Sequence, residues 1–316
     1  DADSPEAFIG MSTLASPMQS WRVDTTTGDC RALPGPGGPE LPDLDISRDR
    51  ATSADGAQVP YWIIRRSDAV RGQAPTILYG YGGFGVPEST RYRAGWLGWL
   101  MSGGSVVIGN LRGGSEFGQA WHEQGKGPHK QNVFNDFIAI AEKLISDDVT
   151  TADQLVSYGR SNGGLLVGAT MTQRPDLFAA AIPQVGVLDL LRFHKFTIGA
   201  AWISDYGDPD QPEDFEVALA YSPLHNIREH GRYPATLVVT GDHDDRVVPA
   251  HSHKFTAALQ AVQPEDAPPV LTRIESSTGH GAGKPLALQA SEWADVLAFA
   301  AHHTGLDLDL LRRSVG

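Results

Sequence analysis

The segment GRSNGG at residues 159–164 constrains the fold more than any other part of this chain. It follows an apolar run at 155–158 and precedes a helix-like segment at 165–171, which predicts a strand, a tight turn and a helix. Small residues on both sides of Ser161 allow a strained turn that holds its hydroxyl clear of the sheet. The start of the helix also offers backbone N–H groups where negative charge would develop. The pattern therefore favours Ser161 as a nucleophile over the alternative, an ordinary glycine turn without catalytic function.

Strands and helices alternate along most of the chain. Apolar runs predict strands at residues 46–52, 59–65, 76–79, 106–111, 179–182, 235–240 and 270–274. A one-sided apolar pattern from 134 to 145 predicts a helix packed on the sheet, and a last helix is expected at 286–303. This alternation predicts an α/β protein with a mostly parallel sheet covered by helices on both faces. In such sheets the working residues lie beyond the carboxyl ends of the strands.

The first residues do not follow that pattern. Residues 21–33 predict a β-hairpin, and the PGPGGP run at 34–39 predicts a linker. A two-stranded hairpin is marginally stable alone, so we expect it to lean on another part of the protein. The predicted organisation is a hairpin and linker at 1–45, followed by one α/β domain at 46–316.

Composition limits the classes of partner. With 38 acidic and 25 basic residues the formal charge is −13, which disfavours nucleic acid and anionic membranes as partners. The single cysteine, Cys30, excludes an internal disulfide and a cysteine-rich metal site. No apolar run reaches the roughly 18 residues of a membrane span, and no signal peptide opens the chain as given. We expect a cytoplasmic location, with a periplasmic one as the alternative.

A serine hydroxyl needs a general base, and the base must be oriented by a third group. On a sheet of this kind the three residues follow the chain order Ser, acid, His. Of the 11 histidines, chain order and position favour His280, which lies in a glycine-flanked loop past the last predicted strand. The acid should follow the preceding strand, where Asp242, Asp244 and Asp245 are all candidates. Spacing alone does not choose among them.

Acyl transfer also needs donors for a developing oxyanion. One is expected to be the backbone N–H of Asn162, and the second should come from the glycine-rich loop at 80–85. The glycine pairs lack the lysine and the ribose-binding acid of nucleotide sites, so we expect no cofactor. The His-Asp-Asp run at 243–245 is a poor zinc set, and we expect no metal.

Six ordered motifs resemble the catalytic domain of the prolyl oligopeptidase family. They are YGYGGFG at 79–85, GRSNGGLLVGA at 159–169, QRPDLF at 173–178, QVGVLDLLRFHKFTIGAAWISDYG at 184–207, GDHDDRVVP at 241–249 and GHGAGKP at 279–285. The resemblance covers nearly all of residues 46–316. It implies an α/β-hydrolase fold, preceded by a short β segment that resembles the end of a β-propeller blade.

The resemblance also implies a role for each site residue. Ser161 would be the nucleophile, Asp244 the orienting acid and His280 the base, with the Tyr81 hydroxyl joining the Asn162 N–H in the oxyanion hole. The implied substrates are short proline-containing peptides, cut on the carboxyl side of proline through an acyl-enzyme. The residues implied to bind them, by stacking on the proline ring, completing its pocket or holding a peptide carbonyl, are Trp202, Phe84, Val187, Tyr206, Val247 and Arg246.

Three alternatives stay open at this point. Related enzymes of the oligopeptidase B type cut after Arg or Lys and need carboxylates near the pocket, where Asp205 lies close by in sequence. A less selective acyl-peptide hydrolase or esterase would use the same three residues. The chain could also be a binding module that kept the fold without the chemistry.

The chain departs from the family pattern in two places. The family's β-propeller, which covers the active site, has no counterpart long enough here, so we expect this chain to be the C-terminal part of a longer enzyme. Arg160 replaces the glycine that many members carry beside the nucleophile, a change we expect to be tolerated.

Overall fold

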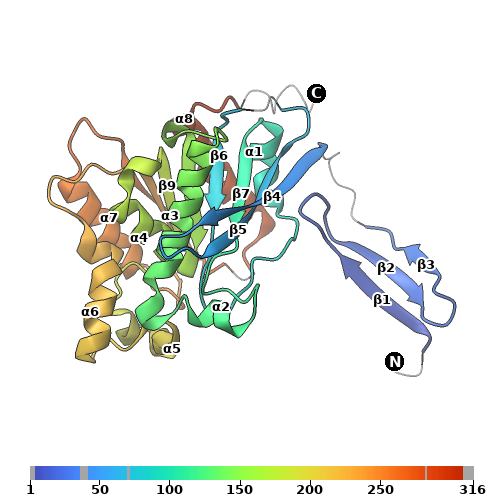
Figure 1. Ribbon diagram of the computed structural model, residues 1–316, viewed down its shortest axis with the longest axis horizontal. Helices are drawn as coiled ribbons and strands as arrows, with labels where there is room; N and C mark the ends of the chain where they lie inside the picture. Colours follow the sequence, from blue (N-terminus) through green and yellow to red (C-terminus); the bar gives the residue numbers. More distant parts are fainter. Residues whose placement is uncertain (1–3, 36–41, 70–71, 282, 309–316) are drawn as a thin grey trace.

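The computed structural model describes residues 4–35, 42–69, 72–281 and 283–308 (Figure 1). The linker predicted at 34–39 therefore lies largely outside the described residues. The strands are β1 (Glu6–Met11), β2 (Gln19–Asp24), β3 (Cys30–Ala32), β4 (Leu44–Thr52), β5 (Gln58–Arg66), β6 (Thr76–Tyr79), β7 (Ser105–Gly109), β8 (Leu155–Arg160), β9 (Ala180–Gln184), β10 (Ala235–Gly241) and β11 (Val270–Glu275).

The main sheet has eight strands in the order β11-β10-β9-β8-β6-β7-β5-β4. The six strands from β11 to β7 are parallel to their neighbours, whereas β5 and β4 complete the sheet in antiparallel pairing. All seven strands predicted from apolar runs are present, as is the strand that ends at the glycine turn. The topology is the α/β-hydrolase fold, so the prediction of a mostly parallel sheet is confirmed.

Helices cover both faces of this sheet. The α-helices are α1 (Leu97–Met101), α2 (Gln119–Glu123), α3 (Gln131–Ser146), α4 (Asn162–Gln173), α5 (Ile203–Tyr206), α6 (Pro212–Tyr221), α7 (Ala250–Val262) and α8 (Leu286–Thr304). None of the helices in the described parts of the chain has both the length and the apolar character that crossing a bilayer requires.

Side-chain alternation along the strands explains the two covered faces. In β6, Leu78 packs into the core formed with α3 and α4, while its neighbours Ile77 and Tyr79 pack into the core formed with α1 and α8. A third cluster joins α4 and α7 to β9, β10 and β11. Because the central strands are buried on both faces, they consist of nearly continuous apolar runs, which is why the sequence located them.

The first three strands form a separate antiparallel sheet in the order β1-β2-β3. The predicted hairpin is present as β2 and β3, and a further strand that was not predicted, β1, pairs along the other edge of β2. This small sheet stands beside the main domain in Figure 1.

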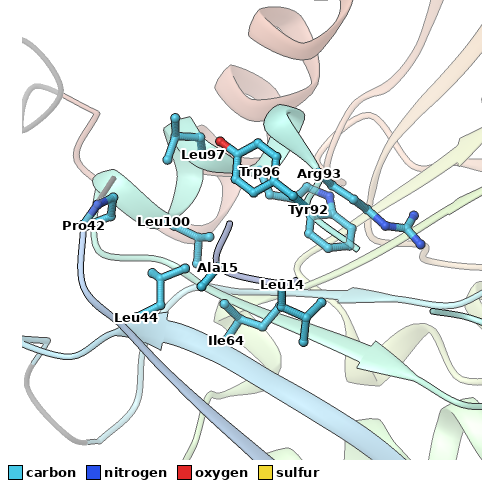
Figure 2. Close-up of a pocket in the computed structure, with 10 residues that line it drawn as sticks. All are labelled: Leu14, Ala15, Pro42, Leu44, Ile64, Tyr92, Arg93, Trp96, Leu97 and Leu100. Atoms are coloured by element: carbon cyan, nitrogen blue, oxygen red, sulfur yellow. The ribbon is translucent and has the colours of Figure 1, made fainter. Parts of the chain in front are cut away.

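The small sheet is anchored through the loop between β1 and β2. Leu14, only 8% exposed, lies in an apolar site between α1 and the start of the main sheet, next to Ile64 and Leu100 (Figure 2). The backbone N–H of Tyr92 donates to Ser12 Oγ at 3.1 Å. One buried leucine and this hydrogen bond are therefore part of the support that the hairpin was expected to need.

A buried ion pair ties the antiparallel edge of the sheet to α3. The guanidinium of Arg112 is 1% exposed, and its Nη2 lies 2.6 Å from Oδ1 of the fully buried Asp136. The same guanidinium also reaches Asp55 in the turn between β4 and β5, and Ser53 Oγ at 3.1 Å. Breaking such a pair from one side leaves a buried charge without its main partner.

We expect replacement of Asp136 by alanine to lower the free energy of unfolding by about 3–5 kcal/mol, because Arg112 would stay buried with reduced compensation. Urea unfolding followed by far-ultraviolet circular dichroism measures this change. The control is Asp147→Ala, which removes an exposed ion pair with Lys143 and should change stability by less than about 1 kcal/mol. Equal effects of the two substitutions would contradict the assignment.

Candidate active site

The turn between β8 and α4 has the strained geometry that the glycine pattern predicted. The backbone of Ser161 has φ 60° and ψ −118°, a conformation that residues other than glycine rarely adopt. A Cβ atom on Gly159 would lie 2.2 Å from the carbonyl oxygen of Gly163, so only glycine fits there. The Ser161 N–H donates to the carbonyl of Gln184 at 2.9 Å, which ties the turn to the end of β9.

The loop after β11 brings His280 to the serine. Its Nε2 lies 3.0 Å from Ser161 Oγ, although the two residues are 119 positions apart in sequence. Its Nδ1 lies 2.7 Å from Oδ2 of Asp244. The imidazole is 15% exposed and the carboxylate is fully buried. The structure therefore brings together the three side chains proposed from the sequence.

The choice among the three aspartates is settled by the path of the loop after β10. Asp242 pairs with the neighbouring His243 at the surface, at 2.6 Å. Asp244 instead points inward, where its Oδ1 accepts the backbone N–H groups of Arg246 at 3.0 Å and Val247 at 2.9 Å. These two bonds hold one carboxylate oxygen and leave the other for His280.

The two residues proposed for the oxyanion hole, Tyr81 and Asn162, are linked to each other by a hydrogen bond. Burial raises the pKa of Tyr81, and the charge of Asp205 acts in the same direction, while the Ser161 side chain lowers it. Tyr81 therefore keeps its proton and can donate it. Asn162 begins α4, and its side-chain amide donates to the Tyr81 carbonyl and accepts from the Tyr206 hydroxyl at 2.9 Å.

The predicted pocket residues gather in one apolar cluster next to this site. Val187, Tyr206 and Val247 are buried in it, and Phe84 and Trp202 pack against it. The rings of Phe84 and Tyr206 meet edge to face with centroids 5.3 Å apart. Arg246 lies at the surface of the same loop as Asp244.

Phe193 belongs to this cluster but was not named from the sequence. Its ring is stacked with that of Trp202 at 6.4 Å and meets Tyr206 edge to face at 5.2 Å. The Phe193 side chain is fully buried and packs against both of these rings. The only sequence signal was its place inside the long motif at 184–207, and apolar residues in such motifs are usually core.

The burial of Lys130 beside the glycine-rich loop was also missed. Lys130 is 1% exposed and Asp205 is 3% exposed, and their Nζ and Oδ2 atoms lie 3.2 Å apart. Asp205 Oδ1 lies 2.9 Å from His122 Nε2. Nothing in the sequence around Lys130 marks it as buried, because lysines at the start of helices are normally solvated.

Among the described residues, one group of side chains has the geometry of a metal site. One donor atom from each of His194, Asp208 and Asp210 lies within 4.8 Å of the other two. However, the ammonium of Lys195 lies 2.9 Å from Asp210 Oδ1 and already supplies a positive charge there. The group includes none of the three residues Ser161, Asp244 and His280.

His251 lies in the first turn of α7, directly after the loop that carries Asp244. It is 1% exposed, and its Nδ1 accepts the backbone N–H of Asp189 at 3.1 Å. Burial lowers the pKa of His251 from 6.5 to about 4, against a smaller opposing effect of the Asp189 charge. The imidazole is therefore neutral in the folded protein at neutral pH, as its acceptor role requires.

Comparison with known proteins gives a consistent result. A family model described as the prolyl oligopeptidase family matches residues 93–307. The chain is 50% identical over 257 residues to a prolyl endopeptidase of Elizabethkingia miricola, covering 81% of this chain and 36% of that protein. It is 43% identical over 304 residues to a prolyl endopeptidase of Elizabethkingia meningoseptica, covering 95% of this chain and 43% of that protein.

Solved structures agree with the sequence matches. A structure from work on two prolyl endopeptidases has a TM-score of 0.91 to this chain at 41% identity. The match covers 96% of this chain and 45% of that one. The chain thus spans less than half the length of the relatives it matches.

The depressed pKa of His251 predicts that stability depends on pH. Because the unfolded imidazole titrates near 6.5, the unfolded chain binds a proton before the folded one does, so the contribution is complete above about pH 6.5 and is lost as pH falls toward 4. Between pH 7 and pH 5 we expect this group alone to cost about 2 kcal/mol. Urea unfolding at both pH values measures the loss.

The control is His251→Asn, which keeps an acceptor near the position of Nδ1 but does not titrate. Its loss of stability between pH 7 and pH 5 should be smaller than that of the unsubstituted protein by about 2 kcal/mol. The same loss in both proteins would show that His251 is not the responsible group.

Proposed function

The chain belongs to the prolyl oligopeptidase family, as its motifs predicted, and on this premise we propose that it is a serine peptidase that cuts short peptides on the carboxyl side of proline. One observation carries the proposal, namely the His280 imidazole lying between Ser161 Oγ at 3.0 Å and Asp244 Oδ2 at 2.7 Å. That arrangement suits proton transfer from an alcohol to a neutral imidazole.

The proposed reaction has two steps. Ser161 Oγ attacks the carbonyl carbon of the substrate while His280 Nε2 takes its proton, and Asp244 stabilises the imidazolium that forms. The Tyr81 hydroxyl and the Asn162 N–H stabilise the oxyanion. His280 then gives the proton to the leaving amine, and the acyl-enzyme remains. A water molecule, deprotonated by the same imidazole, hydrolyses this ester and restores the serine.

The apolar cluster supports proline as the preferred residue before the cut. Proline has a rigid ring and no N–H, so its binding site needs apolar faces and no acceptor. Trp202, Phe84 and Tyr206 supply aromatic surface beside the nucleophile, and Phe193 holds the first of these rings. Arg246 supports a further contact, because its guanidinium could bind a peptide carbonyl upstream of the proline.

The alternatives receive less support. Cleavage after Arg or Lys needs a free carboxylate in the pocket, whereas Asp205 is buried and already faces Lys130 and the N–H of Phe84. A less selective acyl-peptide hydrolase or esterase would not need the aromatic cluster. A binding module without chemistry would not need a strained backbone at Ser161, whose maintenance costs free energy.

We propose as partner of this chain a β-propeller domain of the same polypeptide. The support is the small sheet, on which Phe8 and Met11 of β1 are 68% and 59% exposed. Exposed apolar side chains on a short sheet are typical of a surface that another element covers. Intact-mass measurement of the natural protein should give a mass well above that of these 316 residues, and a mass no greater than theirs would contradict this proposal.

We expect the protein to hydrolyse a Gly-Pro chromogenic amide with kcat/KM at least about 100-fold above that for an Arg-Arg amide, because the pocket lacks a free carboxylate. Replacing Ser161 with alanine should lower kcat by about 10⁴-fold or more while binding of a proline peptide, measured by calorimetry, persists. A fluorophosphonate probe should modify Ser161 in the unsubstituted protein only.

The matched control is Ser146→Ala at the end of α3, which should leave turnover and labelling unchanged. Preference for the Arg-Arg substrate would overturn the assignment of specificity. Unchanged turnover in the Ser161 variant would exclude this serine as the nucleophile.

A further inference from the structure

The side chain of Asp205 binds the backbone of the glycine-rich loop at residues 80–85. It lies on α5 next to the pocket residue Tyr206, and its carboxylate has three partners. Oδ1 accepts the backbone N–H of Phe84 at 3.1 Å and lies 2.9 Å from His122 Nε2, while Oδ2 lies 3.2 Å from the ammonium of Lys130. A carboxylate with this many partners binds one side of the loop to the helix that forms the pocket.

Lys130 contacts the same loop two residues before Phe84. Its Nζ donates to the carbonyl oxygen of Gly82 at 3.0 Å and lies 5.2 Å from the centroid of the Tyr206 ring. Burial lowers the pKa of Lys130, and the charge of Asp205 opposes this effect. A lysine is seldom retained in such a place unless its partners need its charge and its hydrogen bonds.

The loop depends on these contacts because its backbone is strained. Phe84 has φ 57°, a left-handed conformation that costs about 1–2 kcal/mol for a residue with a Cβ. Such a conformation persists only where surrounding bonds hold it. Lys130 binds the residue after Tyr81, Asp205 binds Phe84, and the side-chain amide of Asn162 binds the Tyr81 carbonyl. Tyr81 is thus held from both sides.

We propose that Asp205, paired with Lys130, is a positioning residue that fixes the Tyr81 hydroxyl and the aromatic pocket in one shared geometry. The proposal rests on the proposed function, since it assigns to Tyr81 the role of an oxyanion donor. Asp205 touches neither substrate nor nucleophile, and it acts through Tyr81 on the rate and through Phe84 on the choice of proline. A displacement of the loop would therefore shift the Tyr81 hydroxyl and the Phe84 ring at the same time.

The chemical reason is that an oxyanion donor is effective only when its hydrogen atom is already aimed at the developing charge. Loss of the pair would let the loop relax from its strained conformation and would displace the Tyr81 hydroxyl. Displacements of about 1 Å at a reacting centre cost up to about 100-fold in rate. The same relaxation would separate the Phe84 ring from Tyr206 and weaken the preference for proline.

The test compares Asp205→Asn with the double variant Lys130→Met/Asp205→Asn. The single variant keeps an acceptor for the Phe84 N–H but leaves the Lys130 ammonium without its counter-charge, whereas the double variant removes both buried charges and guards against failure to fold. Active sites are counted with a fluorophosphonate probe. In both variants we expect kcat per labelled site for a Gly-Pro amide to fall at least about tenfold, and preference over a Gly-Ala amide to fall at least about threefold.

A double-mutant cycle with Tyr81→Phe separates positioning from general damage. If Asp205 acts on the rate through the Tyr81 hydroxyl, Asp205→Asn should change kcat by less than about twofold when that hydroxyl is absent. The matched control is Asp189→Asn, another fully buried carboxylate that pairs with a lysine, Lys254. It should lower thermal stability but leave kcat per labelled site within about twofold.

Each outcome has one meaning. Additive effects of Asp205→Asn and Tyr81→Phe, or an unchanged kcat in both Asp205 variants, would overturn the positioning role while leaving the peptidase intact. Loss of thermal stability with unchanged kcat per labelled site would show a purely structural role and would also overturn it. Failure of the unsubstituted protein to cut the Gly-Pro amide would instead refute the proposed function.

Discussion

The strained backbone at Ser161 is the constraint on which the rest of the site depends. The turn is held by close approaches of glycine backbones, because a Cβ on Gly163 would lie 2.5 Å from the carbonyl oxygen of Gly80 and one on Gly164 would lie 2.6 Å from Cα of Gly186. Gly80 begins the loop of Tyr81, and Gly186 precedes the pocket residue Val187. The packing that holds the nucleophile therefore also sets the distance to the oxyanion loop and to the pocket wall.

Two buried carboxylates near this turn are held by several polar partners each. Asp244 faces His280 and two backbone N–H groups, and Asp205 faces Lys130. Both carboxylates also accept backbone N–H groups of the loops that form the site, and so they hold those loops in place. The interaction energy of such groups is large in a region without water, and so is the penalty for losing one partner.

The sequence was sufficient to predict those elements whose structure is set by residues close together in the chain. Buried parallel strands need continuous apolar runs, and a strained turn needs glycine on both sides, so the main sheet and the turn at Ser161 could be predicted. Strand β1 could not, because its exposed Phe8 and Ile9 do not alternate with polar residues facing water. The choice of Asp244 over Asp242 from the residues alone, and the burial of Lys130, depend on contacts between segments far apart in the chain. Only the family resemblance supplied the first, and nothing supplied the second.

Arg160 shows how a departure from the family pattern is accommodated. Its guanidinium lies against the loop of His280, where a Cβ on Gly281 would come within 1.9 Å of Arg160 Nη2. Gly281 has φ +112°, a conformation open to glycine, so the absence of a side chain there serves the backbone and makes room for the arginine. A large residue beside the nucleophile is therefore compatible with the 3.0 Å approach of His280 to Ser161. A residue with a side chain at position 281 would need this strained backbone and would also displace the end of the Arg160 side chain, so the two positions are coupled.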